Sequence, residues 1–150
     1  MTAIEPARPT DRPAIEGILR ANDLPTAGLE LALGTAVVAR EDGQIVGCAA
    51  VEIYGRVGLL RSVCVAPPFR SLGLGARLVE EAETLAAARD VAELFLLTET
   101  AADWFARRGY EPDARESAPG PLQASPEFTG GCPVSATLLR KRLNREAPAT

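Results

Sequence analysis

The apolar residues near the start of the chain recur at helical spacing. They stand at positions i, i+3 and i+4 of one short stretch, namely Ile15, Ile18 and Leu19. This spacing is typical of the buried face of an amphipathic helix. Thr10 or Asp11 can cap its start, and Pro13 is tolerated in a first helical turn. We therefore expect a short helix that ends near residues 22–25, followed by a loop or a second short helix over residues 26–34.

Three apolar stretches follow, and short polar segments separate them. The stretches cover residues 35–40, 45–53 and 57–65. Asp42-Gly43 between the first two is the signature of a tight hairpin turn. The third stretch is mostly apolar along its whole length, which favours a central strand buried on both faces. The pattern predicts a three-stranded antiparallel meander.

Helical and strand patterns alternate in the second half of the chain. We expect a helix over residues 76–89, a strand over 91–98, a helix over 101–108 closed by Gly109, and a last strand over 135–143. Residues 111–131 are rich in Pro, Gly, Ser and Ala, so a loop is expected there. The last residues, 144–150, are expected to be a flexible tail.

This order of elements predicts an α/β or α+β fold in which helices flank one mixed, mostly antiparallel sheet. The length of 150 residues suits one domain, which we place at residues 1–143. Only 5% of the residues are aromatic, so the core must consist mainly of Leu, Val, Ala and Ile.

The charge balance restricts the possible partners. The formal net charge is −4, which argues against nucleic-acid binding, because that binding needs a basic face. Backbone amides can still hold an anionic cofactor. The N-terminus has no signal-peptide pattern, and no apolar run approaches the roughly 18–20 residues that span a bilayer. We therefore expect a cytoplasmic protein that does not bind membranes.

The counts of cysteine and histidine exclude several chemistries. The three cysteines, Cys48, Cys64 and Cys132, show neither a disulfide framework nor a zinc-binding spacing. The chain has no histidine at all, which rules out Ser-His-Asp and Cys-His catalysis and any histidine-ligated metal. We expect no metal, and we treat the cysteines as small apolar residues, with metalloid binding as the alternative.

The stretch Arg70-x-x-Gly73-x-Gly75 joins the expected central strand to the start of the long helix. A helix N-terminus has unpaired N–H groups and a partial positive charge. Two glycines let an anion approach the backbone closely, and Arg70 adds a charge. The alternative is a tight strand-to-helix turn without a ligand. A Walker motif is absent, and Leu78 stands where a dinucleotide-binding motif would have its third glycine.

In context, this stretch resembles the acetyl-coenzyme A motif of the GNAT N-acetyltransferases. That family has a V-x-V-x-P strand before [RQ]-x-x-G-x-[GA], and here Val63-Cys64-Val65-Ala66-Pro67 precedes Arg70. The end of a later helix also resembles the family, whose pattern there is F-Y-x-x-x-G-F; this chain has Trp104-Phe105 through Gly109-Tyr110. The resemblance covers most of residues 3–111. It implies a GNAT-like fold in which splayed strands form the cleft for acetyl-CoA.

The resemblance implies which residues contact acetyl-CoA. The central strand would bind the pantetheine arm through its backbone, and the glycine-containing loop would bind the pyrophosphate. The implied residues are Val63, Cys64, Val65, Arg70, Ser71, Leu72, Gly73, Leu74, Gly75 and Ala76. The acetyl carbonyl would lie between the diverging strands, near Val63 and Thr98.

The proton-transfer groups are less well defined. The family often has a tyrosine acid where this chain has Phe105, and phenylalanine cannot donate a proton. Glu52 and Glu99 are the carboxylates expected nearest the cleft, so they are the candidate bases. For each, the alternative is a solvent-exposed charge at the end of a strand.

Three further residues are candidates for binding the acceptor, namely Arg61, Ser62 and Thr98. A charged residue inside a buried strand is costly unless it is paired. Arg61 is therefore expected either to hold a substrate carboxylate by a bidentate bond or to form an ion pair with a neighbouring glutamate.

The choice of acceptor rests on narrower resemblances. Four stretches resemble the small bacterial acetyltransferases associated with arsenic resistance, namely Leu60-Arg61-Ser62-Val63, residues 96–101, Ser125-Pro126-Glu127-Phe128 and Cys132-Pro133-x-Ser135-Ala136. Residues 96–101, Leu-Leu-Thr-Glu-Thr-Ala, also resemble N-acetylglutamate synthases. Both imply a small amino-acid-like acceptor, such as an arsenical or phosphinic analogue of glutamate.

Two other functions are compatible with the same motifs. The chain could be a non-catalytic acetyl-CoA-binding regulatory module, which would explain Phe105, or a protein N-terminal acetyltransferase with an open peptide groove. Family resemblance also suggests a homodimer formed through the C-terminal strand.

Overall fold

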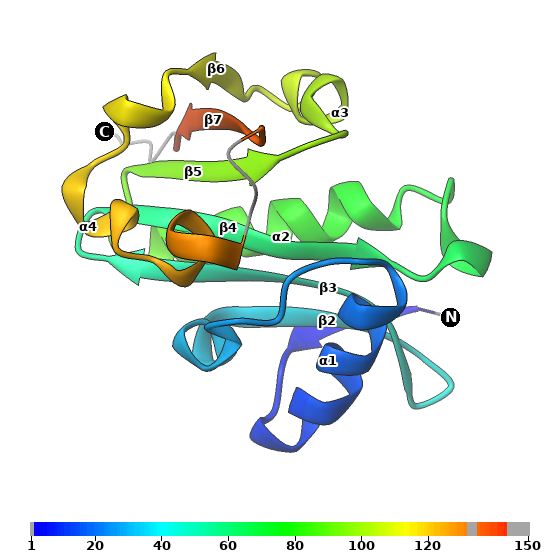
Figure 1. The fold of residues 1–150 in the computed structure, drawn as a ribbon. Coiled ribbons are helices and arrows are strands. Elements are labelled where there is room, and N and C mark those ends of the chain that lie inside the picture. The colour runs from blue at the N-terminus through cyan, green and yellow to red at the C-terminus, as the bar shows by residue number, and fades with distance from the viewer. Residues whose placement is uncertain (1, 132–134, 144–150) are drawn as a thin grey trace, which may run out of the picture.

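The computed structural model describes residues 2–131 and 135–143. These residues form a seven-stranded sheet in the order β1-β2-β3-β4-β5-β7-β6 (Figure 1). Every adjacent pair is antiparallel except β4 and β5, which run parallel. The strands are β1 (Ala3–Pro6), β2 (Ala36–Glu41), β3 (Gln44–Tyr54), β4 (Val57–Val65), β5 (Glu93–Thr98), β6 (Glu111–Asp113) and β7 (Thr137–Arg142). The expected tail at 144–150 and Cys132 lie outside the described residues.

Four α-helices accompany the sheet, namely α1 (Arg12–Ala21), α2 (Leu74–Ala88), α3 (Ala102–Ala106) and α4 (Gly120–Gln123). Short 3-10 turns lie at Pro9–Asp11, Leu29–Leu31, Leu33–Thr35, Pro67–Phe69 and Arg115–Ser117, and a π-helical turn lies at Glu127–Gly131. The mixed, mostly antiparallel sheet flanked by helices confirms the predicted fold class.

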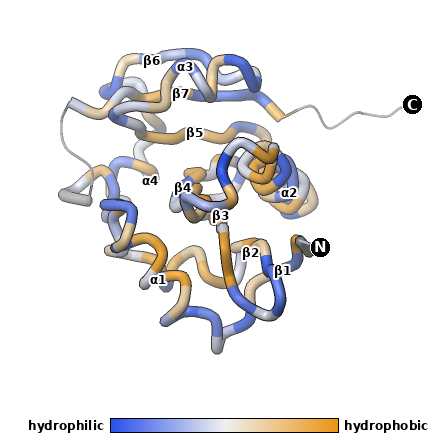
Figure 2. The backbone as a smooth tube through the Cα atoms, turned by 90° about the vertical axis from the view of Figure 1, so that its right-hand side faces the viewer, coloured by the Kyte–Doolittle hydropathy of each residue, from blue (hydrophilic) through white to orange (hydrophobic). Residues whose placement is uncertain are grey.

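The two long helices cover opposite faces of the sheet (Figure 2). Side chains alternate between the faces of a strand, and β2 shows this directly. Val37 and Ala39 pack in the core cluster that contains Leu78 of α2, whereas Val38 packs with Leu19 of α1. The meander is therefore buried on both faces, as its continuous apolar pattern predicts.

Two segments differ from the prediction. Strand β1 was not predicted, because Ala3–Pro6 is only four residues long and is assembled by pairing with β2. Residues 111–131, expected as a loop, contain β6, α4 and the π-helical turn. Elements of three to five residues show too few positions for a period to be recognised.

The parallel pair β4 and β5 separates after three residues. Val57–Leu59 pair with Glu93–Phe95, and beyond this point the two strands have no common register. The remainder of β5 continues to pair with β7, from Leu96 to Thr98. The strands therefore diverge in the middle of the sheet (Figure 1).

A bulge in β4 lies where this divergence begins. The register with β3 steps from Cys48 opposite Cys64 to Ala50 opposite Arg61, so β4 contains one more residue than β3 over this stretch. Ser62 within it has a φ of +60°, a left-handed conformation that costs a non-glycine residue about 1 kcal/mol. Such bulges are frequent beside functional sites, where they interrupt the hydrogen-bond ladder.

Candidate functional site

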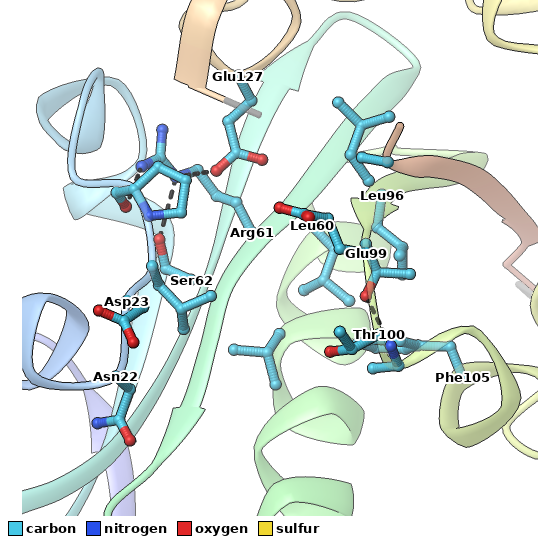
Figure 3. Close-up of a pocket in the computed structure, with 17 residues that line it drawn as sticks. Asn22, Asp23, Leu60, Arg61, Ser62, Leu96, Glu99, Thr100, Phe105 and Glu127 are labelled. Carbon is cyan, nitrogen blue, oxygen red and sulfur yellow. Dashed lines mark hydrogen bonds and ion pairs between the residues drawn. The ribbon is translucent and has the colours of Figure 1, made fainter. Parts of the chain in front are cut away.

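Two cavities join in the gap between the diverging strands. The first has a volume of about 700 Å³ and is lined from one side by β4 and from the other by Leu96–Ala101 (Figure 3). The second has a volume of about 460 Å³ and lies against the start of α2. Both cavities are lined by Val63, Ala101 and Phe105. These three residues mark a junction, and the two cavities form one continuous cleft.

The second cavity is suited to hold an anion at the start of α2. Gly73 caps this helix with a φ of +77°, and the first N–H groups of a helix have no partner within it. A Cβ at Gly73 would meet no atom within 4 Å, so the backbone there is open. The N-terminal end of the helix dipole also favours negative charge.

Eight of the ten predicted cofactor residues line this second cavity. They are Val63, Cys64, Val65, Arg70, Ser71, Gly73, Leu74 and Gly75. Leu72 is 72% exposed to solvent and is not among the lining residues. Ala76 lines a different cavity, further along α2. Arg70 donates to the carbonyl of Val65 at 2.9 Å and to Asn22 at 2.5 Å, so it ties the loop to β4 and α1.

Arg108 and Trp104 also line the second cavity, and the sequence did not single them out. The guanidinium of Arg108 lies 3.6 Å from the centre of the Trp104 ring. Its Nε is buried and has no hydrogen-bond partner within the described part of the chain. Buried donors are nearly always paired, so this atom indicates a missing acceptor. An elongated anionic group such as acetyl-CoA fits a cleft with this donor and the open helix N-terminus.

Glu52 lies beneath the first cavity and is not one of its lining residues. Its Oε2 accepts a hydrogen bond from Arg61 at 2.8 Å, and its Oε1 accepts from the Tyr54 hydroxyl at 2.5 Å and the Ser125 hydroxyl at 2.7 Å. The carboxylate is 1% exposed. Both oxygens of this predicted base are therefore engaged by an internal network. Burial of the phenol, together with its hydrogen bond to Glu52, raises the pKa of Tyr54 to about 12.

Arg61 joins three parts of the chain behind the first cavity. Its side chain is 0% exposed, and its Nε lies 3.5 Å from Glu127 in addition to the pair with Glu52. Its other acceptors are the Ser62 hydroxyl and the carbonyls of Ala27 and Pro25, at 3.0, 2.8 and 3.4 Å. Of the two arrangements expected for Arg61, the ion pair with a glutamate is present in this structure.

The remaining polar residues line the first cavity itself. Glu99 is exposed on the β5 side (Figure 3). The hydroxyl of Thr98 accepts from the backbone N–H of Ala101 at 3.0 Å and thereby fixes the start of α3. Ser62 lines the cavity at the bulge. Glu127, only 4% exposed, belongs to the resembling stretch at 125–128 but was not predicted as a site residue, because that segment was expected to be a loop.

Phe105 sits at the junction of the two cavities. Its ring packs edge-on against Trp104 at 4.8 Å and Tyr110 at 5.5 Å. The hydroxyl of Tyr110 donates to Glu83 at 2.9 Å, and burial raises the pKa of this phenol. Tyr110 is not among the residues that line the junction, so the position where the family often has an acid is occupied by an apolar ring.

The two described cysteines lie opposite each other on β3 and β4 as free thiols. Cys48 donates to the carbonyl of Ser62 at 3.1 Å, and burial raises the pKa of both thiols. Within residues 2–131 and 135–143, no group of three or more His, Cys, Asp or Glu is placed to hold a metal ion. No helix among these residues is long and apolar enough to cross a membrane.

Comparison with known proteins shows the family. Residues 32–112, more than half of the chain, match the family model of the acetyltransferase (GNAT) domain. An amino-acid acetyltransferase of Pseudomonas fluorescens is 41% identical over 86 residues, which are 56% of this chain and 20% of that protein. An uncharacterized N-acetyltransferase of Chlorobaculum tepidum is 37% identical over 83 residues, or 55% and 53% of the two chains. This chain thus spans only about a fifth to a half of the curated relatives it matches.

Solved structures share the fold. N-acetylglutamate synthase from Neisseria gonorrhoeae, in complex with coenzyme A and N-acetylglutamate, aligns with a TM-score of 0.82 at 23% identity, over 97% of this chain and 36% of that one. A Mycobacterium tuberculosis protein in complex with CoA aligns with a TM-score of 0.75 at 21% identity, over 94% and 99% of the two chains. At this level of identity the likeness establishes the fold alone.

Proposed function

Because the chain belongs to the GNAT acetyltransferase family, we propose that it transfers the acetyl group of acetyl-CoA to the amino group of a small amino-acid-like acceptor. One observation carries the proposal: an anion-binding cavity and an acceptor-sized cavity meet at Val63, Ala101 and Phe105. Transfer requires two substrates to meet at one point, and this junction provides it. We treat residues 1–143 as the catalytic domain.

The cofactor would lie along the second cavity. Backbone N–H groups of residues 71–76 would bind its pyrophosphate, since they surround the N-terminus of a 15-residue helix. The backbone of Val63 and Val65 would bind the pantetheine arm beside the bulge, where the β-ladder is interrupted. Acetyl-CoA supplies an activated thioester at the junction. The solved relatives that hold coenzyme A support this placement.

The acceptor would enter through the first cavity and lose a proton before attack. Glu99 is the candidate base, because it lines this cavity, whereas Glu52 is enclosed in the network with Arg61. A carboxylate at the cavity surface can take the proton through a water molecule. Phe105 offers no proton to the leaving thiolate, so the helix N-terminus would have to stabilise that charge.

The narrower proposal is that the acceptor is a glutamate analogue, such as an arsenical or phosphinic amino acid. Relatives named amino-acid acetyltransferase support it. Arg61 is the one cationic side chain among the described residues lining the first cavity. Its contact with Glu127, at 3.5 Å, is longer than its contact with Glu52, at 2.8 Å. An acceptor carboxylate would therefore bind Arg61 by replacing Glu127, with Ser62 and Thr98 beside it.

The family match covers the two cavities to different extents. The family match covers every residue of the second cavity, but residues 22–25, 127 and 136 of the first cavity lie outside it. Part of the proposed acceptor site therefore lies outside the family match. We further propose a role in arsenic resistance, a cytoplasmic location and a homodimer.

A non-catalytic acetyl-CoA-binding module is the second candidate function, and Phe105 at the junction favours it. A protein N-terminal acetyltransferase is less favoured, because Glu127 and residues 25–27 are held by Arg61 as a wall of the first cavity. An extended peptide would need that wall to open.

A thiol-release assay across a panel of amines tests these possibilities. The panel contains glutamate, phosphinothricin, arsinothricin, other amino acids, polyamines and short peptides. We expect turnover with amino-acid acceptors, and turnover confined to glutamate analogues would support the narrower proposal. Binding of acetyl-CoA without thiol release from any amine would instead establish the non-catalytic module. Turnover with peptides alone would overturn the small-acceptor proposal.

A further inference from the structure

A third cavity adjoins the cleft at the side away from the acceptor. It has a volume of about 340 Å³ and is lined by residues of α2, the end of α3 and β7, namely Ala76, Val79, Glu80, Glu83, Arg107, Arg108 and Lys141. It shares Arg108 with the second cavity and shares no lining residue with the first. The three cavities thus follow one another in a line, with Arg108 between the second and the third.

The charged groups of this third cavity differ in what they already contact. Lys141 lies 3.0 Å from Glu83, which also accepts from the Tyr110 hydroxyl. Arg107 is exposed to solvent. Arg108 forms no ion pair with any carboxylate in the described ranges, although it lies partly enclosed between α2 and α3. Among the described residues of this cavity, Arg108 is the partly enclosed cation that has no ion pair.

The guanidinium of Arg108 is held in one orientation. Nη1 donates to the carbonyl of Trp104 at 2.8 Å, and the group lies over the Trp104 ring at 3.6 Å. Both contacts restrict its rotation. Nε has no acceptor in the described part of the chain. Nε is enclosed, so Nη2 is the guanidinium donor left to meet a ligand where the second and third cavities adjoin. Guanidinium N–H groups form charge-assisted hydrogen bonds with phosphate oxygens.

We propose that Arg108 binds the 3′-phosphate of the cofactor's adenosine and so makes this protein select coenzyme A over dephospho-coenzyme A. The proposal rests on the proposed function, because it requires acetyl-CoA in the cleft. Coenzyme A carries a pyrophosphate and a 3′-phosphate, and the order of the cavities indicates that Arg108 lies near the 3′-phosphate. With the thioester at the junction and the pyrophosphate at the start of α2, the ribose and its 3′-phosphate come next, towards the third cavity.

A purely structural role for Arg108 predicts a different result. If the guanidinium only covered the Trp104 ring, its removal would change the affinity for every ligand of the second cavity equally. A 3′-phosphate contact affects only ligands that carry this phosphate. Comparing coenzyme A with dephospho-coenzyme A therefore separates the two roles without any measurement of turnover.

The test is a binding titration of wild type, Arg108→Ala and Arg107→Ala with the two ligands. Trp104 is the single tryptophan of the chain and lines the second cavity, so its fluorescence reports occupancy, and calorimetry provides a second readout. We expect wild type to bind coenzyme A about tenfold or more tightly than dephospho-coenzyme A. Arg108→Ala should bind both with similar affinity, its Kd for dephospho-coenzyme A remaining that of wild type.

Arg107→Ala is the matched control, because it removes the same charge from the neighbouring position and should keep the wild-type ratio. Should Arg108→Ala not fold, as judged by its melting temperature, Arg108→Gln provides the same comparison. Three outcomes would overturn the assignment to Arg108. They are an equal loss of affinity for both ligands in Arg108→Ala, an unchanged ratio of the two Kd values in that variant, or loss of this ratio in Arg107→Ala alone. Failure of wild type to bind either ligand would overturn the proposed function itself.

Discussion

The Nη1 atom of Arg61 lies 2.8 Å from Oε2 of Glu52, and both side chains are almost fully enclosed, at 0% and 1% exposure. The pair joins β4 to β3 directly below the first cavity. Through Arg61 it also fixes Glu127 and the carbonyls of Pro25 and Ala27. Two residues that resemble catalytic groups in the sequence therefore shape the wall of the cavity.

Replacing Glu52 by glutamine should destabilise the fold strongly. The variant leaves Arg61 with only the longer ion pair to Glu127, at 3.5 Å. Breaking a buried pair costs up to about 3–5 kcal/mol. Urea unfolding of Glu52→Gln measures the loss. Glu99→Gln is the control, because an exposed carboxylate should change stability by less than about 0.5 kcal/mol. Equal stability of both variants would mean that the pair does not support the wall.

Gly73→Glu should abolish cofactor binding. The new side chain would extend into the open space at the start of α2 and place a negative charge where the pyrophosphate is expected. Gly43→Glu is a matched control in the distant β2–β3 hairpin. Both glycines have positive φ, +77° and +82°, and at neither would a Cβ meet an atom within 4 Å. Both should therefore lose a similar stability, about 1 kcal/mol, and only Gly73→Glu should lose affinity in a titration with coenzyme A.

Glu99→Gln should lower kcat by about a hundredfold, which is the typical contribution of a general base. The KM for acetyl-CoA should change little, because Glu99 lines the first cavity and not the second. An unchanged kcat in Glu99→Gln would remove Glu99 from the proton pathway.

Phe105→Tyr should raise kcat if departure of the thiolate limits the reaction. The new hydroxyl would lie at the junction of the two cavities, where it can donate a proton, and we expect an increase of about tenfold. Tyr110→Phe is the control, since its hydroxyl bonds Glu83 instead. That variant should lose about 1 kcal/mol of stability with no change in turnover. No gain in Phe105→Tyr would show that another step limits the rate.

The contact between Asp11 and Arg40 predicts a pH dependence of stability. The hydrogen bond from Arg40 holds the pKa of the Asp11 carboxyl below its ordinary value of 3.8. A lowered folded-state pKa adds stability above the ordinary value, and this contribution is lost as the pH falls through the folded-state pKa. Asp11→Asn should therefore be less stable than wild type at pH 7, and the difference should shrink below about pH 4. A difference that does not vary with pH would contradict the ion pair.

The local elements of this fold could be predicted because their signals lie within a few residues. The tight turn at Asp42-Gly43, the strand over Val57–Val65 and the helix that follows Gly73 are each indicated by neighbouring residues. The start of α2, where we propose that the pyrophosphate binds, belongs to this class, since one glycine-containing segment builds it. Strand β1 could not be predicted in this way, because Ala3–Pro6 becomes a strand only through its pairing with β2.

The roles of the charged residues depended on contacts between distant parts of the chain. Glu52 and Arg61 meet through the register of β3 and β4, which one bulge at Ser62 changes. A shift of one residue moves a side chain to the opposite face of a strand, so no local pattern reveals which face Arg61 occupies. The sequence by itself determined the family, the strands of the central meander and the helix that follows Gly73, because local chemistry encodes them. Only the tertiary structure decided which charges face the cleft and which neutralise one another, because burial and long-range pairing set those energies.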